Sequence, residues 1–250
     1  MNVFATYNIK GGVGKTTSCV TLAWLAAREG RRTLLWDLDP QGAASFYLRI
    51  KAKVKGGAKS LLRKERGLDE VIKGTDYPNL HLIPADFRYR QMDLLLDESK
   101  KPARRVERLL RPLRKEYDLA FLDCPPSVSL LSESVFGAAD ALIVPMIPTT
   151  LSVRTLVQLR KFCAEQGFDE KRIWPFFTMV DRRKRLHNEI MNALPEHFPN
   201  VLQTYVSYAS DVERMGIHRK PVTEFAPRSA PALAYESLWS ELSERIQKGL

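Results

Sequence analysis

One glycine-rich segment, Asn8–Thr17 with sequence NIKGGVGKTT, constrains the fold more than any other part of the chain. The apolar run before it, Val3–Asn8, is typical of a short buried strand, and the stretch after it, Thr16–Arg28, predicts a helix that Gly30 ends. Glycines between a strand and a helix let backbone N–H groups curl around phosphate oxygens, and the helix N-terminus adds partial positive charge. We therefore expect a phosphate-binding loop.

Further along the chain, apolar strands alternate with amphipathic helices, without repeats or low-complexity linkers. Strands are predicted at Thr33–Leu38, Leu80–Pro84, Leu119–Leu122, Ala141–Val144, Ile173–Val180 and Val201–Val206, with Pro175 indicating a late start or an edge position for the sixth strand of the chain. Helices are predicted at Ala103–Lys115, Thr150–Gln166, Leu186–Ala193 and Ala230–Gln247, and Arg49–Arg66 predicts a mobile loop. Continuous apolar strands between helices favour a doubly wound α/β fold, with a mostly parallel sheet flanked by helices, in a single domain over residues 1–250.

Composition excludes several classes of protein and draws attention to charge. Hydrophobic residues make up 44% and charged residues 27%, as in soluble globular proteins, and no apolar stretch approaches the roughly 18 residues that a membrane span needs. The first ten residues lack the pattern of a secretory signal, and three cysteines without CxxC spacing fit a reducing cytosol. The formal net charge of +10 favours a polyanionic partner.

The phosphate loop carries two lysines. In the general pattern G-x-x-x-x-G-K-[ST], Lys15 reaches the β- and γ-phosphates and the Thr16 hydroxyl coordinates Mg²⁺. The first glycine of that pattern would fall at Ile9, and the chain instead has Lys10-Gly11-Gly12, the deviant Walker A form KGGxGKT. Because Lys15 already covers its own nucleotide, Lys10 could supply charge to a second protomer, as an arginine finger does.

In residues 10–17 the chain resembles the ParA/MinD family of P-loop ATPases. The resemblance implies that ATP and Mg²⁺ are the cofactors and that two protomers sandwich two ATP molecules, each Lys10 contacting the partner's phosphates. It implies the nucleotide-binding set Lys10, Gly11, Gly12, Val13, Gly14, Lys15, Thr16 and Thr17. Residues 178–181 resemble the family segment whose following loop borders the adenine.

Three aspartates extend the resemblance. Leu35–Gly42 matches the family segment DxDPQG, which implies that Asp37 lies near the Mg²⁺ hydration shell and that Asp39 orients the attacking water. Asp123 ends the strand Leu119–Leu122 and resembles the Walker B residue that holds Mg²⁺ through water. An aspartate after a strand is by itself more often a helix cap, but the phosphate loop in the same chain reverses that ranking. The implied catalytic set is Lys10, Lys15 and Asp39, and the implied metal set is Thr16, Asp37 and Asp123.

The positive charge gathers in three clusters. Residues 49–66 and 100–115 each hold eight Lys or Arg and one Glu, and in the second of these an apolar helical stripe explains the arginines as a solvated face. The third comprises Arg182, Arg183, Lys184 and Arg185, with Arg214, Arg219, Lys220 and Arg228 later in the chain. Arg183 matches a position that the family uses for nonspecific DNA binding, although the family's arginine pair is absent from residues 207–214.

The resemblance implies a ParA-like ATPase that dimerises with ATP, binds DNA nonspecifically and positions a cargo (plasmid, chromosome or protein complex), with hydrolysis stimulated by a partner protein. Such a protein is cytoplasmic and nucleoid-associated. The first alternative is a MinD-like membrane-associated ATPase, which needs a cationic amphipathic helix; the tail from Ser237 carries Glu241 and Glu244 against Arg245 and Lys248, so packing on the domain explains its apolar stripe better and a membrane partner is disfavoured. The second alternative is a metabolic P-loop enzyme.

Overall fold

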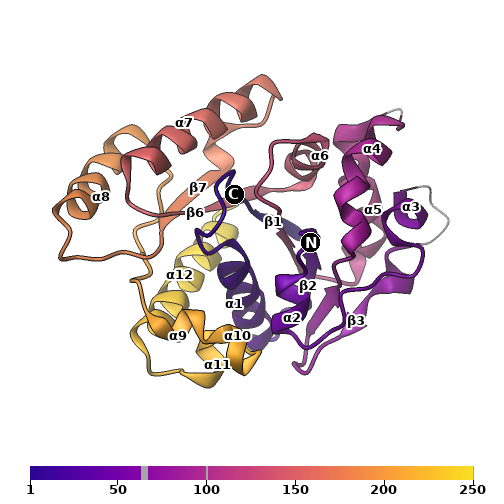
Figure 1. Ribbon diagram of the computed structural model, residues 1–250, viewed down its shortest axis with the longest axis horizontal. Helices are drawn as coiled ribbons and strands as arrows, with labels where there is room; N and C mark the ends of the chain where they lie inside the picture. Colours follow the sequence, from indigo (N-terminus) through magenta and orange to yellow (C-terminus); the bar gives the residue numbers. More distant parts are fainter. Residues whose placement is uncertain (63–66, 100, 250) are drawn as a thin grey trace.

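The computed structural model describes residues 1–62, 67–99 and 101–249, and within them one seven-stranded sheet runs through the centre (Figure 1). Its spatial order is β3-β4-β2-β5-β1-β6-β7, and every neighbouring pair is parallel except β3 and β4. The strands are β1 Asn2–Thr6, β2 Thr33–Asp37, β3 Lys73–Gly74, β4 Leu80–Ile83, β5 Leu119–Asp123, β6 Ala141–Met146 and β7 Ile173–Phe177. The predicted doubly wound, mostly parallel α/β fold is confirmed.

Helices cover both faces of the sheet. Those described are α1 Lys15–Arg28, α2 Ala43–Tyr47, α3 Gly57–Leu62, α4 Met92–Asp97, α5 Arg105–Leu110, α6 Leu130–Ala138, α7 Thr150–Glu165, α8 Arg185–His197, α9 Ser210–Glu213, α10 Met215–His218, α11 Val222–Phe225 and α12 Ala230–Gln247. Short 3₁₀ turns lie at Asp69–Val71, Phe87–Gln91, Pro102–Arg104, Arg111–Lys115 and Glu170–Arg172.

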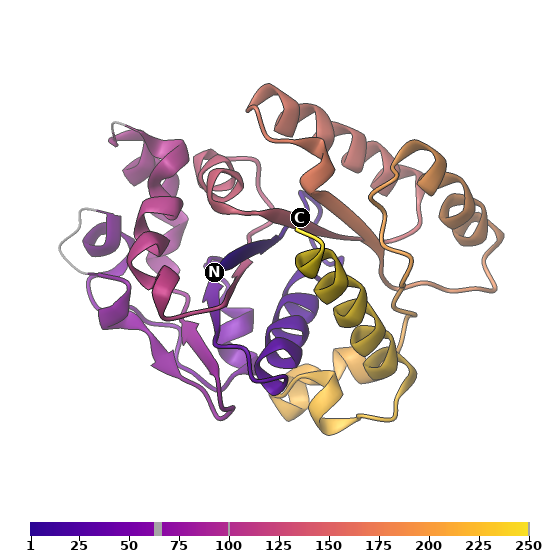
Figure 2. The ribbon, with the colours of Figure 1, turned by 180° about the vertical axis from the view of Figure 1, so that it is seen from behind.

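The two faces of the sheet have separate apolar cores. In β1, Val3 and Ala5 pack toward α3–α8, whereas Phe4 packs toward α1, α2, α10, α11 and α12. This alternation follows from the two-residue period of a strand, and both faces are apolar because helices cover both. Figure 2 shows α12 lying beside α1 on the second face, where the two helices are in contact.

The C-terminal helix α12 begins and ends where the sequence predicts, at Ala230 and Gln247. Its apolar residues Leu238, Trp239 and Leu242 are buried in the core, so this stripe is part of the fold, as the sequence indicated. Within the described ranges, no helix is long and apolar enough to cross a membrane.

Two strand predictions are wrong. Strand β7 ends at Phe177 rather than Val180, and residues 201–206 form no strand. This second segment does run beside β7, where the amides of Leu202 and Val206 donate to the carbonyls of Pro175 and Phe177. Because Pro175 has no amide hydrogen to donate in return, the ladder is interrupted. Val180 and Ser207 form an isolated parallel bridge beyond it.

Several helical regions differ from the predictions, and the short helices α2, α4, α9, α10 and α11 were not predicted. The helix expected over Ala103–Lys115 is divided into α5 and two 3₁₀ turns, because Pro102 and Pro112 lie in the first positions of those turns and cannot donate. The mobile loop expected at Arg49–Arg66 is wrong for residues 49–62, which contain α3 and the buried side chains of Val54 and Ala58, and residues 63–66 lie outside the described chain. Helix α6 was not predicted because buried serines break its apolar pattern.

Candidate nucleotide-binding site

The carboxyl ends of three neighbouring strands, β2, β5 and β1, bring the predicted phosphate loop and the aspartates together. In the strand register Asp37 pairs with Asp123, and Thr6, the last residue of β1, also pairs with Asp123. Parallel strands place such end positions at one edge of the sheet, where ligands of open α/β folds bind. The adjacency of residues 86 positions apart in sequence is therefore a direct result of strand order.

The loop has the backbone geometry of an anion cradle. Gly12 and Gly14 have φ of +71° and +87°, values that side chains with a Cβ rarely adopt, and no atom lies within 4 Å of a Cβ built on Gly11 or Gly12. Helix α1 begins at Lys15 without a side-chain cap and without an acidic residue in its first turn. Its first N–H groups are thus free of the local carboxylates that would compete with a phosphate.

Side chains hold this loop in place from both sides. Asn8 donates its Nδ2 to the Pro145 carbonyl at 2.8 Å and accepts from the Lys10 amide at 2.9 Å, tying the loop to β6. The Lys15 Nζ donates to the Lys10 carbonyl at 3.0 Å, so this lysine points back across the loop. Burial lowers the pKa of Lys15, and the nearby Asp123 and Asp39 partly oppose that shift. Lys10 itself is only half-buried.

Asp37 and Asp123 are fully buried, and three of their four carboxylate oxygens have no hydrogen-bond partner in the described part of the chain. Burial raises the pKa of Asp37 to about 6, and its proximity to Asp39 adds to the shift. Burial and the neighbouring Asp37 raise the pKa of Asp123 well above its ordinary value, while Thr16 and Lys15 act in the opposite direction. Two buried carboxylates with unpartnered oxygens are costly unless a cation joins them.

The donor set fits Mg²⁺. This ion is commonly held by one or two carboxylates and a hydroxyl together with waters and substrate phosphates, rather than by a cage of protein ligands. Accordingly, among the described residues no group of three or more His, Cys, Asp or Glu could hold a metal alone. The structure brings Asp37 and Asp123 together and places Thr16 at the start of α1, beside them.

Ser45, which sequence analysis did not single out, fixes Asp37. Its amide and its hydroxyl donate to Asp37 Oδ2 at 2.8 and 2.7 Å, and the same hydroxyl accepts from the Ala85 amide at 2.9 Å. One oxygen of Asp37 is therefore immobilised, and the other, Oδ1, stays unpartnered. A small polar residue within Ala43–Tyr47 was the only signal in the sequence.

Asp39 lies in the turn that follows β2. Its Oδ1 accepts from the Gln41 amide and its carbonyl accepts from the Gly42 amide, both at 2.9 Å. Gly42 has a φ of +68° and directly precedes α2, and this helix places Ser45 against Asp37. The side chain of Asp39 is half-buried and close enough to Lys15 of the phosphate loop for its charge to oppose the lowering of the pKa of that lysine by burial.

A small cavity adjoins the loop on the side of β7. Its lining includes Gly14, Thr17, Thr178, Met179, Tyr208 and Tyr235. Thr178 anchors the loop by donating to the Val13 carbonyl at 2.9 Å, and Tyr235 of α12 is hydrogen-bonded to Ser18 of α1 at 2.9 Å. The segment that the sequence associates with the adenine thus borders the phosphate loop.

The four consecutive cations, Arg182 to Arg185, are all exposed; the first three lie between β7 and α8, and Arg185 begins α8. Two are paired with acids: Arg183 donates to both Asp181 oxygens, and Arg185 donates to Glu189 at 2.7 Å. Arg182 lies over the Tyr205 ring, with 5.7 Å between its guanidinium carbon and the ring centroid. Arg182 and Lys184 have no acidic partner within the described chain.

The later cations differ from one another. The parallel bridge Val180–Ser207 sets the segment leading to Arg214 beside the turn of Arg182 to Arg185, and Arg214 is exposed. Arg219 instead donates to the Phe46 carbonyl at 2.9 Å and lies over that ring, while Lys220 pairs with Glu224 at 3.5 Å. Arg219 therefore helps to attach α10 to α2.

Comparisons with known proteins agree with this geometry. Residues 1–168 match the model of a family described as AAA domain. The chain is 32% identical over 252 residues to an uncharacterized protein of Pseudomonas putida, covering 98% of this chain and 96% of the relative. It is 31% identical over 247 residues to the sporulation initiation inhibitor protein Soj of Bacillus subtilis, covering 96% and 98%.

A solved structure matches over the whole chain as well. Cobyrinic acid a,c-diamide synthase of Mycobacterium smegmatis, with a bound ATP analog and magnesium, has a TM-score of 0.85 and 25% identity, covering 100% of this chain and 97% of that one. The deviant loop, the paired aspartates and the full-length likeness to Soj lead to one assignment. The chain belongs to the ParA/MinD family of deviant Walker A P-loop ATPases.

Proposed function

We propose that the protein is a ParA-like ATPase that binds ATP with Mg²⁺ in one domain, dimerises with ATP, and binds DNA without sequence preference. The main observation in support of a nucleotide site is the pair of buried carboxylates with unpartnered oxygens, which lies beside the uncapped N-terminus of α1. Backbone N–H groups of residues 11–17 hold the phosphates, Lys15 neutralises the β- and γ-phosphates, and Thr16, Asp37 and Asp123 hold the metal. Bound Mg²⁺ supplies charge neutralisation to the phosphoryl group.

Hydrolysis requires a positioned water and a charge that stabilises the transition state. Asp39 orients the water, a role supported by its place on the turn after β2, next to Lys15. Lys10 acts on the nucleotide of a second protomer. Its side chain is only half-buried and thus open to a partner, which supports this role in trans.

Exposed cations near the nucleotide edge support DNA as the partner. Arg182 and Lys184 have no acidic partner in the described chain, and Arg214 follows a neighbouring segment. Arg183, Arg185, Arg219 and Lys220 complete the proposed set, but each already interacts within the protein. Lys and Arg contacts to phosphates need no base readout, so binding is nonspecific.

The same geometry disfavours the MinD-like membrane alternative. A helix that lies in the membrane interface needs an apolar face free for lipid. The apolar stripe of α12 is in the core, and Glu241 accepts from the amides of Gln203 and Thr204. We propose that the protein works at the nucleoid in the cytoplasm, where a cargo adaptor or other partner protein stimulates its ATPase activity.

The decisive experiment measures binding of fluorescent random duplexes with ATP and Mg²⁺ over a salt series. The double variant Arg182→Ala/Lys184→Ala is expected to weaken all sequences alike and to flatten the log–log salt slope by about two units. The matched control, Arg111→Ala/Arg114→Ala, removes two exposed cations from another surface and keeps the parental slope. Equal slopes in both variants would reject this DNA site, and ATP-dependent sedimentation with anionic vesicles instead of DNA would favour the membrane alternative.

A further inference from the structure

A second pocket lies away from the nucleotide edge, among α3, α4 and α5 on the right-hand flank of Figure 1. Its volume is about 350 Å³. The described lining residues are Leu62, Leu95, Glu98, Ser99, Lys101, Arg105 and Arg108. Three of them are cations and one is an acid, so among the described residues the lining has a formal charge of +2.

Two polar groups of this pocket are buried without a partner among the residues that the structure describes. Within those residues, neither the Ser99 hydroxyl oxygen nor Nε of Arg105 makes a hydrogen bond. A buried donor left unpaired is costly, and more so when it is charged, so such groups are few in a folded protein. Two of them in one pocket, both able to donate, indicate a site that an acceptor completes.

The charges are also unbalanced. Burial lowers the pKa of Arg105, and the positive charge of Arg108 lowers it further. Arg105 and Arg108 lie three positions apart on α5, a spacing that brings side chains together on one face of a helix. Like charges at this spacing destabilise a helix unless an anion lies between them.

We propose that this pocket binds the phosphate group of a small soluble molecule. Ser99, Arg105, Lys101 and Arg108 donate to the phosphate oxygens, and a dianion matches the charge of the lining better than a single carboxylate does. Leu62 and Leu95 form apolar walls against which an organic portion packs. The Nε of Arg105 is buried, so a phosphate that stays on the protein surface, such as that of a duplex backbone, does not contact it.

The test measures phosphate binding by thermal shift and by calorimetry, at constant ionic strength. All proteins are full-length and carry Lys15→Ala, so that any remaining phosphate binding at the loop is common to every sample. Inorganic phosphate is expected to bind, and Arg105→Met to weaken it at least about tenfold, as loss of charged hydrogen bonds does. Ser99→Ala is expected to weaken it about threefold to tenfold without removing charge.

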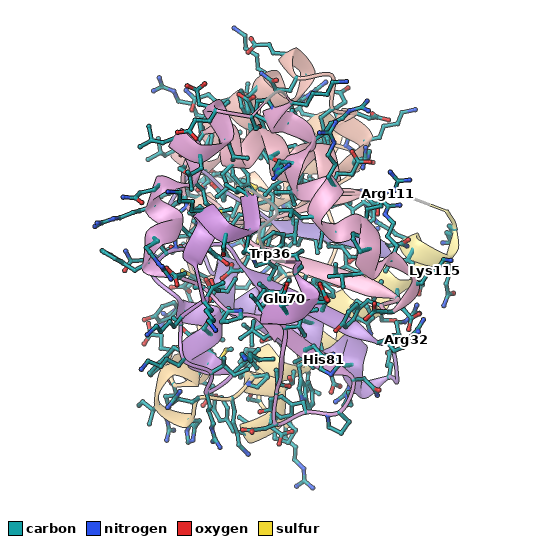
Figure 3. All side chains as sticks on the ribbon, turned by 90° about the vertical axis from the view of Figure 1, so that its right-hand side faces the viewer. Arg32, Trp36, Glu70, His81, Arg111 and Lys115 are labelled. Carbon is teal, nitrogen blue, oxygen red and sulfur yellow. The ribbon has the colours of Figure 1, made fainter. Side chains whose placement is uncertain are left out.

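The matched control is Arg111→Ala, which removes an exposed arginine of the next turn, labelled in Figure 3, that does not line the pocket. It is expected to leave the affinity unchanged. Should Arg105→Met fail to fold, Ser99→Ala and Arg108→Ala carry the test. If these variants bind as the Arg111 variant does, or if the parental protein binds no phosphate below about 10 mM, the proposal is wrong.

Phenyl phosphate distinguishes the two sources of the phosphate group. Tighter binding than inorganic phosphate, lost in Leu95→Ser, identifies a phosphorylated organic molecule that uses the apolar walls. Equal affinity of the two probes identifies free phosphate, and both results support the pocket.

Discussion

Asp37 shows how a single buried carboxylate links metal binding to stability. Its pKa in the folded protein is about 6, above the ordinary value near 3.9, because burial disfavours the charged form. In the unfolded chain the Asp37 carboxyl has its ordinary pKa and loses its proton at lower pH than in the folded protein. In metal-free buffer the free energy of unfolding therefore decreases as pH rises from about 4 through 6. Below pH 4 both states are protonated and the effect vanishes.

The variant Asp37→Asn removes this charge. In EDTA we expect it to be more stable than the parent by on the order of 2 kcal/mol at pH 8, with a smaller difference at pH 5. Urea titrations at the two pH values measure this difference. The exposed Asp76→Asn serves as control, and with ATP and Mg²⁺ present the order should reverse, because the parent keeps its metal ligand. A constant difference across pH would contradict the argument.

Ser45 is the residue through which Asp37 is held. Ser45→Ala removes the hydroxyl that donates to Asp37 and accepts from the Ala85 amide, leaving buried polar atoms unpaired. The expected cost is about 2 kcal/mol, or about 4–8 °C in Tm for a chain of this size. Calorimetry measures it, and the exposed Ser237→Ala should stay within about 1 °C of the parent.

The pH profile separates the role of Ser45 from a purely structural one. The hydrogen bonds of Ser45 lower the pKa of Asp37, so Ser45→Ala should move the pH-dependent loss of stability to higher pH, and Ser45→Thr should restore it. An unchanged profile would leave Ser45 as a packing residue only.

At the level of single residues, the sequence predicts the functional residues that belong to a motif with fixed spacing. It misses those whose role depends on being buried. Lys15 and Asp123 follow from a motif and from the end of a strand. Ser45, Ser99 and Arg105 acquire their environment only from packing across separate elements, and a serine or arginine in sequence does not reveal whether its donor is left unpaired.

Among the elements, α1 and α12 are joined at the nucleotide site by Ser18 and Tyr235, both buried. Tyr235→Phe leaves the Ser18 hydroxyl without its tertiary partner and is expected to cost about 1 kcal/mol, or about 2–4 °C in Tm. The control is Tyr208→Phe, whose exposed hydroxyl donates to Glu213 at the surface and contributes little. Equal decreases in Tm would show that the buried Ser18–Tyr235 hydrogen bond stabilises the protein no more than the exposed one does.

The boundaries of helices and strands were predictable where a long apolar pattern determined them. The limits of α12 and the start of β2 follow from long apolar patterns with clear capping residues. The divided helix near Pro112 and the absent strand at 201–206 each result from a proline that lacks an amide hydrogen. The effect of such a proline depends on which segment of the protein lies beside it. The serine-rich helix α6 is stabilised by burial, and its sequence lacks the apolar periodicity by which a helix is recognised.

For the whole molecule, the prediction concerns assembly. We expect Asp39→Ala to bind ATP and remain dimeric, because the water is no longer oriented, whereas Lys10→Ala binds ATP but stays monomeric. Light scattering with ATP and Mg²⁺ measures both, and Lys15→Ala, which should not bind ATP, is the negative control. A Lys10→Ala protein that dimerises normally would mean that this lysine has no role in trans.

The sheet itself limits how copies of this protein can join. One edge strand of the sheet, β3, has only two residues. At the other edge the segment 201–206 lies along β7, and Pro175 of β7 has no amide hydrogen to donate. Neither edge can template a neighbouring strand, so association by strand addition, the usual route to fibrous aggregates of β-rich chains, is blocked at both sides. The ATP-dependent dimerisation that we propose can then operate at high local concentration without competition from aggregation by strand addition.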